Sequence, residues 1–289
     1  MNIVVCVKIV VSTEQLTRIE GGTSIDDRGL PHVVNMCDLV ALEEALQLKE
    51  KAIATRVTTI SMGTSSAKDG LYKSLAMGAD KAILLCDSAF ASSDSYATSV
   101  VLARAIESLD FGLVLCGKKS SDTGSGQVAY YLAEMLGVPV ISAAVKLQIF
   151  PGEKVVVHRK LRAGFRDVLE APLPAVVSVE SGLNEPRYVS LRAISRAKGR
   201  DIIEYRAKDL GLSLENVGQS GSKTMVISIS RPRPKKIFVP DKNLSAMERL
   251  FQVESGGIEE KKGRLLTGGP QEVASELVSI LLSEKVIQI

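Results

Sequence analysis

The sequence predicts an α/β fold: a doubly wound, mostly parallel sheet with a C-terminal arm and tail. Three observations lead to this prediction. Over residues 2–149, short runs rich in β-branched side chains alternate with segments of helical periodicity. The strand runs are almost continuously apolar, as strands covered by helices on both faces have to be. From residue 184 onward the hydrophobic pattern thins, which indicates an arm outside the core.

Each predicted strand is a short apolar run. The parallel strands are expected at residues 3–10, 57–62, 81–86, 112–116, 140–145 and 174–179. The helices between them are expected at residues 38–51, 68–77, 95–109 and 127–136. Gly78 and Gly137 directly follow two of these helices, where glycine is the usual C-cap residue. Two further runs, 154–161 and 165–169, are separated by a glycine and predict a hairpin.

We expect three parts along the 289 residues, a length sufficient for one large core and an appendage. Residues 1–183 should form the α/β core. Residues 184–236 should form a loop and arm that ends in the basic, proline-rich stretch 231–236. Residues 237–289 should form a C-terminal extension whose last segment, 270–286, has the pattern of an amphipathic helix.

Composition excludes several classes of function. A net charge of +3 is too small to predict nucleic-acid binding, and the absence of Trp argues against base-stacking surfaces. The four cysteines, Cys6, Cys37, Cys86 and Cys116, are far apart and form no Cys-x-x-Cys pair, so we expect neither a metal site nor disulfides. Reduced cysteines suit the cytoplasm. The N-terminal run lacks the pattern of a secretion signal or a transmembrane segment.

Two loops rich in small residues follow predicted strands and lead into helices. Residues 117–128 follow one strand, and residues 62–66 follow another. Open parallel sheets bind ligands at the carboxyl ends of their strands, and free amides at a helix start attract phosphate. The two loops therefore predict one adenine-nucleotide site on a Rossmann-like sheet. The alternative is that Ser, Thr and Asp here are ordinary helix caps, because neither loop has a Walker or Gly-x-Gly-x-x-Gly pattern.

A turn and a basic helix follow the last predicted strand. Asn184, Glu185 and Pro186 form a turn signal, and Leu191 should be an exposed apolar tip ahead of a helix rich in arginine. A single exposed leucine can fill a pocket on another protein. The alternative is a loop that leads to a solvated helix. No catalytic constellation is found, and the adjacent Glu43 and Glu44 are expected to face solvent.

Several islands of sequence resemble the beta subunit of electron transfer flavoproteins. They lie at residues 5–8, 41–50, 76–80, 115–127, 173–177 and 183–191, in matching order and spacing. The resemblance implies a heterodimer with an alpha subunit that holds most of the FAD, and a chain that is not an enzyme by itself. It also implies docking to an acyl-CoA or similar flavin dehydrogenase. The matching partner-recognition residues are Asn184, Glu185, Pro186, Arg187, Tyr188 and Leu191.

The resemblance further implies a nucleotide on this chain, which is AMP in ordinary members and a second FAD in electron-bifurcating members. The matching cofactor-binding residues are Cys6, Asn35, Met62, Gly63, Asp122, Thr123, Gly126, Gln127 and Val128. The bifurcating pattern is Asp-Gly-Asp-Thr-(Ala/Gly)-Gln-Val, whereas this chain has Asp-Thr-Gly-Ser-Gly-Gln-Val at 122–128. Gln127 and Val128, at the end of the loop, favour the bifurcating pattern, but the second aspartate is missing, so on this pattern the ligand can be assigned as either AMP or FAD.

Three functions follow as hypotheses. The first is an electron-transfer subunit that passes electrons through FAD between a flavin dehydrogenase and a further acceptor or donor. The second is a subunit of an electron-bifurcating, NADH-oxidising complex with a second FAD on residues 122–128. The third is a stand-alone adenine-nucleotide-binding regulator or nucleotide hydrolase of similar architecture.

Overall fold

The computed structural model describes residues 1–12, 29–229, 239–254 and 266–283. Its contacts divide the chain into two units, Met1–Ser230 and Arg231–Ile289, each of which is described by itself. The basic stretch expected at 231–236 lies outside the described residues.

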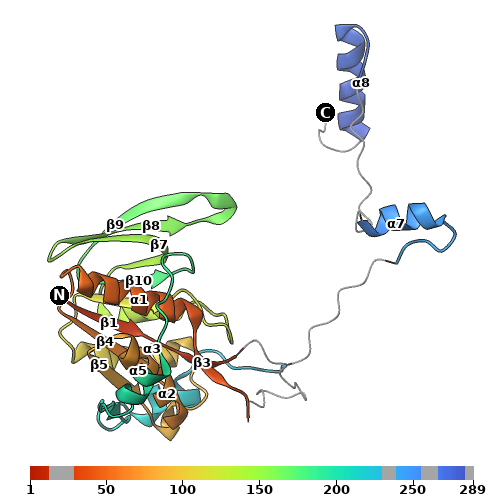
Figure 1. The fold of residues 1–289 in the computed structure, drawn as a ribbon. Coiled ribbons are helices and arrows are strands. Elements are labelled where there is room, and N and C mark those ends of the chain that lie inside the picture. The colour runs from red at the N-terminus through yellow and green to blue at the C-terminus, as the bar shows by residue number, and fades with distance from the viewer. Residues whose placement is uncertain (13–28, 230–238, 255–265, 284–289) are drawn as a thin grey trace. The chain divides into compact units, whose positions relative to one another are not determined.

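The first unit is built on a nine-stranded sheet (Figure 1). In spatial order its strands are β11 (Ile203–Tyr205), β5 (Lys81–Leu85), β4 (Arg56–Met62), β1 (Asn2–Cys6), β6 (Leu113–Gly117), β10 (Ala175–Val179), β7 (Val140–Phe150), β8 (Lys154–Lys160) and β9 (Arg166–Pro172). Neighbours from β11 to β7 pair in parallel, and β7, β8 and β9 are antiparallel. The prediction of a doubly wound, mostly parallel sheet is confirmed.

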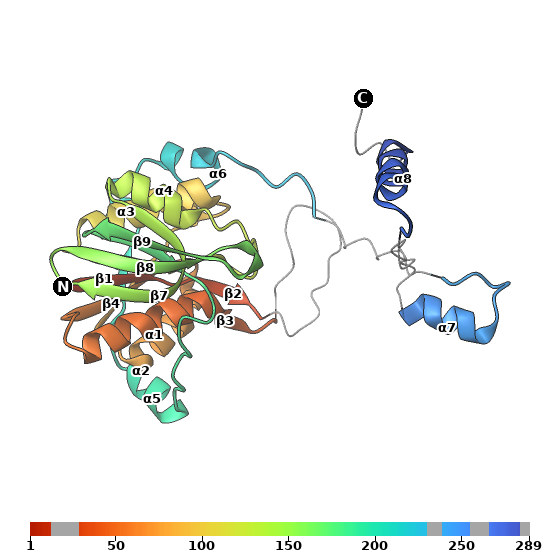
Figure 2. The same ribbon diagram turned by 90° about the horizontal axis from the view of Figure 1, so that it is seen from above.

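Helices cover both faces of this sheet. Figure 2 shows α1 (Met36–Glu50) and α2 (Lys68–Met77) on one face, and α3 (Ser95–Glu107) and α4 (Val128–Leu136) on the other. Along β1, Ile3 and Val5 pack in the core cluster on the α1 and α2 side, whereas Val4 and Cys6 pack in the cluster on the α3 and α4 side. Because side chains alternate across a strand, an apolar run can fill both cores at once.

The predicted strand at 3–10 is divided in the structure. β1 ends at Cys6, and β2 (Ile9–Val11) pairs in antiparallel fashion with β3 (His32–Val34) in a separate two-stranded sheet. The chain leaves the main sheet at Lys8, whose backbone N–H donates to a carboxylate oxygen of Asp38 at 2.7 Å. β7 is longer than the expected 140–145, because its ladder with β8 continues to Phe150.

The arm that follows β10 packs on the same unit. It contains α5 (Leu191–Ala197), which packs against α2, and α6 (Gly218–Gly221). Its strand β11 adds to the edge of the sheet beside β5. Two aspartates of the core accept backbone N–H groups from the arm, Asp87 from Ala207 at 3.1 Å and Asp94 from Lys223 and Thr224 at 2.8 Å each. Short 3₁₀ helices lie at Ser65–Ala67, Ser88–Phe90, Arg162–Gly164 and Leu214–Asn216.

The second unit contains α7 (Ala246–Glu254) and α8 (Pro270–Ser283). The helix expected at 270–286 is present over its described part. Within the described ranges, no helix is long and apolar enough to cross a membrane.

Candidate functional site

The loops predicted to bind a nucleotide lie at one edge of the sheet. β4, β1 and β6 are parallel neighbours, and Cys6 is in register with Ile60 on one side and Cys116 on the other. Their carboxyl ends therefore lie together. The loop at 62–66 continues from β4 and the loop at 117–128 continues from β6, so the fold brings the two predicted loops to the same edge.

Asp38, in the first turn of α1, connects the ends of two of these strands. Its carboxylate accepts the backbone N–H of Lys8 at 2.7 Å and that of Gly117 at 2.9 Å. Burial raises its pKa to about 7, and the two backbone hydrogen bonds offset part of that rise. Gly117 has no room for a side chain, because an added Cβ would lie 2.2 Å from Asp38 Oδ1. Asp38 was not among the predicted site residues.

Asn35, a predicted cofactor-binding residue, is buried just before α1 and holds the loop at 117–128. Its side-chain N–H donates to the Lys119 carbonyl at 3.0 Å, and its carbonyl oxygen accepts the Ser121 N–H at 3.2 Å. Farther along the loop, Asp122 forms an ion pair of 2.6 Å with Lys8. Partial burial raises the pKa of Asp122, whose side chain is still 36% exposed, but the contacts with Lys8 and neighbouring hydroxyl and amide groups outweigh it, so the net pKa is lowered. Contacts with the α1 start and the β1 end therefore fix the loop.

Three of the helices that begin at this edge lack side-chain caps, whereas α3, whose Ser95 Oγ lies 2.9 Å from Ser125 Oγ of the loop, is capped. Gln127 precedes α4, Thr64 precedes the 3₁₀ helix at Ser65–Ala67, and Asn35 precedes α1, and none of the three side chains caps its helix. By contrast, Asp94 caps α3 and Ser190 caps α5. Uncapped amides at a helix start can bind an anion, so the starts of α4 and of the Ser65–Ala67 helix are candidate positions for a phosphate.

The remaining predicted residues of the loop are exposed or partly exposed. Asp122, Thr123 and Gln127 are exposed, and Gly126 and Val128 are partly buried. Gly126 has φ +63°, a conformation that favours glycine, and an added Cβ would make a tight contact of 3.2 Å with the Lys118 carbonyl oxygen.

Met62 and Gly63 line a cavity of about 540 Å³ at the end of β4. The other lining residues are Ile9, Gly29, Leu30, His32, Thr64, Ser66 and Ala67. Cys6, by contrast, has its thiol in the core on the α3 and α4 side, where burial raises its pKa to about 12. The predicted cofactor residues thus occupy one edge of the sheet, but they do not all line one cavity.

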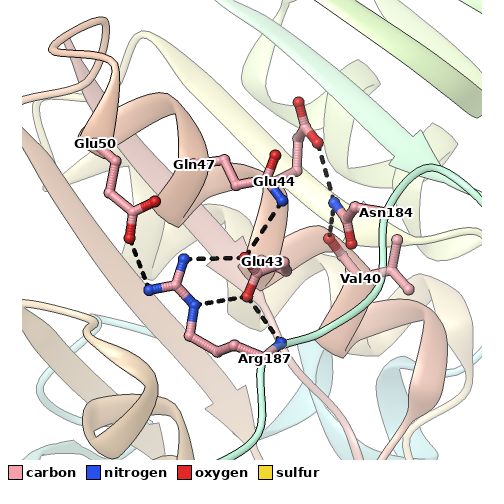
Figure 3. Close-up of polar contacts among 7 residues, drawn as sticks. All are labelled: Val40, Glu43, Glu44, Gln47, Glu50, Asn184 and Arg187. Atoms are coloured by element: carbon pink, nitrogen blue, oxygen red, sulfur yellow. Dashed lines mark hydrogen bonds and ion pairs between the residues drawn. The ribbon is translucent and has the colours of Figure 1, made fainter.

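The second predicted site, residues 184–191, has two exposed large hydrophobic side chains. Tyr188 is 90% exposed and Leu191 is 82% exposed. Leu191 is the first residue of α5, whereas the sequence placed it ahead of that helix. Glu185 is also exposed, and Pro186 is partly buried. Asn184 and Arg187, in contrast, are directed at α1 (Figure 3).

The expectation that Glu43 and Glu44 face solvent is wrong. They are only 4% and 7% exposed, because residues 184–187 lie over this side of α1 (Figure 3). Glu43 binds Arg187 through both carboxylate oxygens, with Nε at 2.8 Å and Nη2 at 2.9 Å. Glu44 accepts from the Asn184 side chain at 3.0 Å. Buried carboxylates require such partners, and adjacent helical positions can both be buried when two elements cover the helix.

The carboxyl groups of Glu43 and Glu44 differ in acidity. Burial raises the pKa of Glu43, but the hydrogen bonds from Arg187 outweigh it and the net pKa is lowered. The pKa of Glu44 is raised, because the single hydrogen bond from Asn184 only partly offsets burial. The ion pair also raises the pKa of Arg187, so Glu43 and Arg187 both carry charge in the folded chain.

Comparison with known proteins matches residues 22–210 to the electron transfer flavoprotein domain, which is more than half of the chain. The chain belongs to the beta-subunit family of electron transfer flavoproteins. It is 34% identical over 289 residues to the electron transfer flavoprotein subunit beta of Thermoanaerobacterium thermosaccharolyticum, covering 99% of this chain and all of the relative. The Bacillus subtilis subunit beta is 36% identical over 287 residues, covering 98% of each chain.

A third relative is a subunit of a named reductase complex. It is the caffeyl-CoA reductase-Etf complex subunit CarD of Acetobacterium woodii, 34% identical over 291 residues, which cover 99% of this chain and all of the relative. The predicted family is therefore confirmed. Beta subunits of this family pair with an alpha subunit and serve as electron carriers, and the family is associated with flavin and AMP.

Proposed function

We propose that this chain pairs with an FAD-bearing alpha subunit and docks a flavin dehydrogenase of the acyl-CoA type through the segment at 184–191. The observation that carries the docking proposal is the 82% exposure of Leu191 next to the 90% exposure of Tyr188, on a segment that buried contacts hold in place. An exposed apolar anchor of this kind contributes most when it fills a pocket on the partner. Electrons would pass through flavin, in a reducing cytoplasm that suits the free cysteines.

The proposed nucleotide on this chain is held at the edge formed by residues 62–66 and 117–128. The phosphate would meet the uncapped amides at the start of α4 and of the Ser65–Ala67 helix, and Gly63 and Gly126 would allow close approach. Asn35 and Asp122 would act by holding the loop in shape, as their contacts with Lys119, Ser121 and Lys8 indicate. The side chains position the nucleotide, and redox chemistry belongs to the flavin.

Leu191→Ala tests docking. We expect the apparent KM for this complex as electron acceptor of its dehydrogenase to rise by about 5- to 30-fold, the effect of losing 1 to 2 kcal/mol of anchor binding. Flavin content should stay unchanged, because Leu191 lies outside the nucleotide loops. An unaltered KM would show that the dehydrogenase docks elsewhere.

A second candidate is electron bifurcation from NADH with a second FAD on residues 122–128. The observation in its favour is the similarity to a subunit of the caffeyl-CoA reductase-Etf complex, together with the Gln127–Val128 ending of the loop. Quantifying nucleotides released from the co-purified heterodimer separates the two candidates. Two FAD per heterodimer support bifurcation, and one FAD with one AMP supports the simple carrier. The relatives are named as subunits, which argues against the stand-alone regulator.

A further inference from the structure

The docking segment has no regular secondary structure of its own. Residues 183–190 form neither helix nor strand, so its conformation depends on contacts with the rest of the unit. Side chains provide these contacts at four points. Leu183 and Val189 pack against the core cluster on the α1 and α2 side of the sheet, while Asn184 and Arg187 bind α1.

Arg187 makes four hydrogen bonds with carboxylates of α1 (Figure 3). Its backbone N–H, Nε and Nη2 donate to Glu43 at 3.1, 2.8 and 2.9 Å, and Nη1 donates to Glu50 at 2.8 Å. Every nitrogen of the guanidinium therefore has a partner within this chain. The fork of two parallel bonds to Glu43 fixes both the position and the plane of the side chain. Arg187 was expected to contact the partner, but its geometry favours a role inside the subunit.

Asn184 provides a second contact with the same helix. Its side-chain N–H group donates to the Val40 carbonyl at 3.1 Å and to Glu44 at 3.0 Å. Because Glu43 and Glu44 are adjacent on α1, the two contacts lie side by side and hold the chain on both sides of Glu185 and Pro186. We call this arrangement of Glu43, Glu44, Asn184 and Arg187 the α1 clasp.

The clasp determines which side chains of the segment face outward. Arg187 binds α1 and Val189 packs against the core, whereas Tyr188 between them is 90% exposed. Leu191 follows Ser190, whose hydroxyl caps α5 by accepting the Ala193 N–H at 3.2 Å. Leu191, the apolar anchor, is thus the first residue of α5, and only three residues separate it from Arg187 of the clasp.

We propose that Arg187 and Glu43 are positioning residues for electron transfer between this complex and the partner dehydrogenase. Their partly buried ion pair, supported by Asn184 and Glu44, holds Tyr188 and Leu191 in the docking orientation before the partner arrives. This inference rests on the proposed docking function. Holding a loop in its bound conformation raises affinity, because the partner then need not order it.

The variant Arg187→Lys tests the inference, because lysine keeps the charge but cannot form the two-bond fork. The matched control is Arg104→Lys, the same substitution in the exposed Arg104–Glu107 pair on α3. Both are made in the full chain purified with its alpha-subunit partner. Should Arg187→Lys fail to fold, Asn184→Ala removes the second contact of the clasp in its place.

Hydrogen exchange gives a readout that needs no dehydrogenase. We expect the backbone amide of residue 187, whose N–H donates to Glu43 at 3.1 Å, to exchange at least about 10-fold faster in Arg187→Lys, since local opening governs exchange. Arg104→Lys and Leu191→Ala should leave that exchange unchanged. Unaltered exchange in Arg187→Lys would overturn the clasp whatever the docking function is.

Kinetics then separate positioning from direct contact. We expect Arg187→Lys to raise the apparent KM by about 5- to 30-fold with flavin content unchanged. In a Leu191→Ala background the same substitution should add little, because the anchor that it positions is already gone. Fully additive effects, or faster exchange with an unaltered KM, would overturn the positioning role. No effect of Leu191→Ala would instead overturn the docking function, and the inference with it.

Discussion

Asp38→Asn should change how the stability of the chain depends on pH. Asp38 is buried and its pKa is raised from the ordinary 3.8 to about 7. The folded chain therefore holds this proton more tightly than the unfolded chain does. Between about pH 4 and pH 7 the unfolded state has lost the proton while the folded state keeps it, so stability falls as the pH rises through this window. Above about pH 7 the full cost of the buried charge is present.

The size of the effect follows from the two pKa values. A rise from 3.8 to about 7 corresponds to about 4 kcal/mol, at 1.36 kcal/mol for each pKa unit. Asparagine has the same shape and does not ionise, so this dependence on pH is absent in the variant. The backbone N–H groups of Lys8 and Gly117 both donate to this side chain, and asparagine would place its NH₂ group opposite one of them. This loss of one hydrogen bond lowers the free energy of unfolding by about 1–3 kcal/mol at every pH.

Urea unfolding followed by circular dichroism measures this difference, since the chain has no Trp for fluorescence. We expect the free energy of unfolding of the native chain, minus that of Asp38→Asn, to decrease by several kcal/mol between about pH 4.5 and pH 7.5. Asp69→Asn, at an exposed aspartate whose nearest cation is 3.9 Å away, is the control and should show no such trend. A constant difference across this range would refute the reasoning, because Asp38 would then be ionised throughout.

Two further predictions concern the same end of the sheet. Gly117→Ala should lower the free energy of unfolding by about 1–3 kcal/mol, because the new Cβ would lie 2.2 Å from Asp38 Oδ1. Gly199→Ala is the control and should change the free energy of unfolding little, because the nearest atom to its new Cβ would be 3.5 Å away. Thermal denaturation of both variants checks this. Cys6 and Cys116 should resist a thiol reagent at pH 8 until the chain is unfolded, because burial raises the pKa of both thiols, and modification of either in the native protein would contradict this.

Local patterns in the sequence were sufficient to predict the sheet. The apolar runs of β4 and β6 have the length of buried strands, and their predicted positions were correct within a residue. The break at Lys8 could not be predicted in this way. It depends on a carboxylate 30 positions along the chain, which takes the Lys8 amide out of the sheet.

The error at Glu43 and Glu44 has the same physical origin. Two adjacent glutamates on a helix ordinarily indicate a solvated face. Here their partners, Arg187 and Asn184, follow 144 and 140 positions later, so no local window contains both members of either pair. The loop at 117–128 was predictable from its small residues after a strand, whereas its attachment to Asn35 and Asp38 was not.

A single helix organises both candidate sites. The start of α1 holds the nucleotide loop through Asn35 and Asp38, and one to two turns later Glu43 and Glu44 hold the docking segment. Ten of its fifteen residues are buried, because the sheet covers one side and residues 184–187 lie over another. Buried ion pairs often contribute less stability than apolar packing would, but they require one geometry. In the proposed function, that geometry fixes Leu191 relative to the nucleotide edge, so a docked dehydrogenase meets the cofactors at one defined orientation.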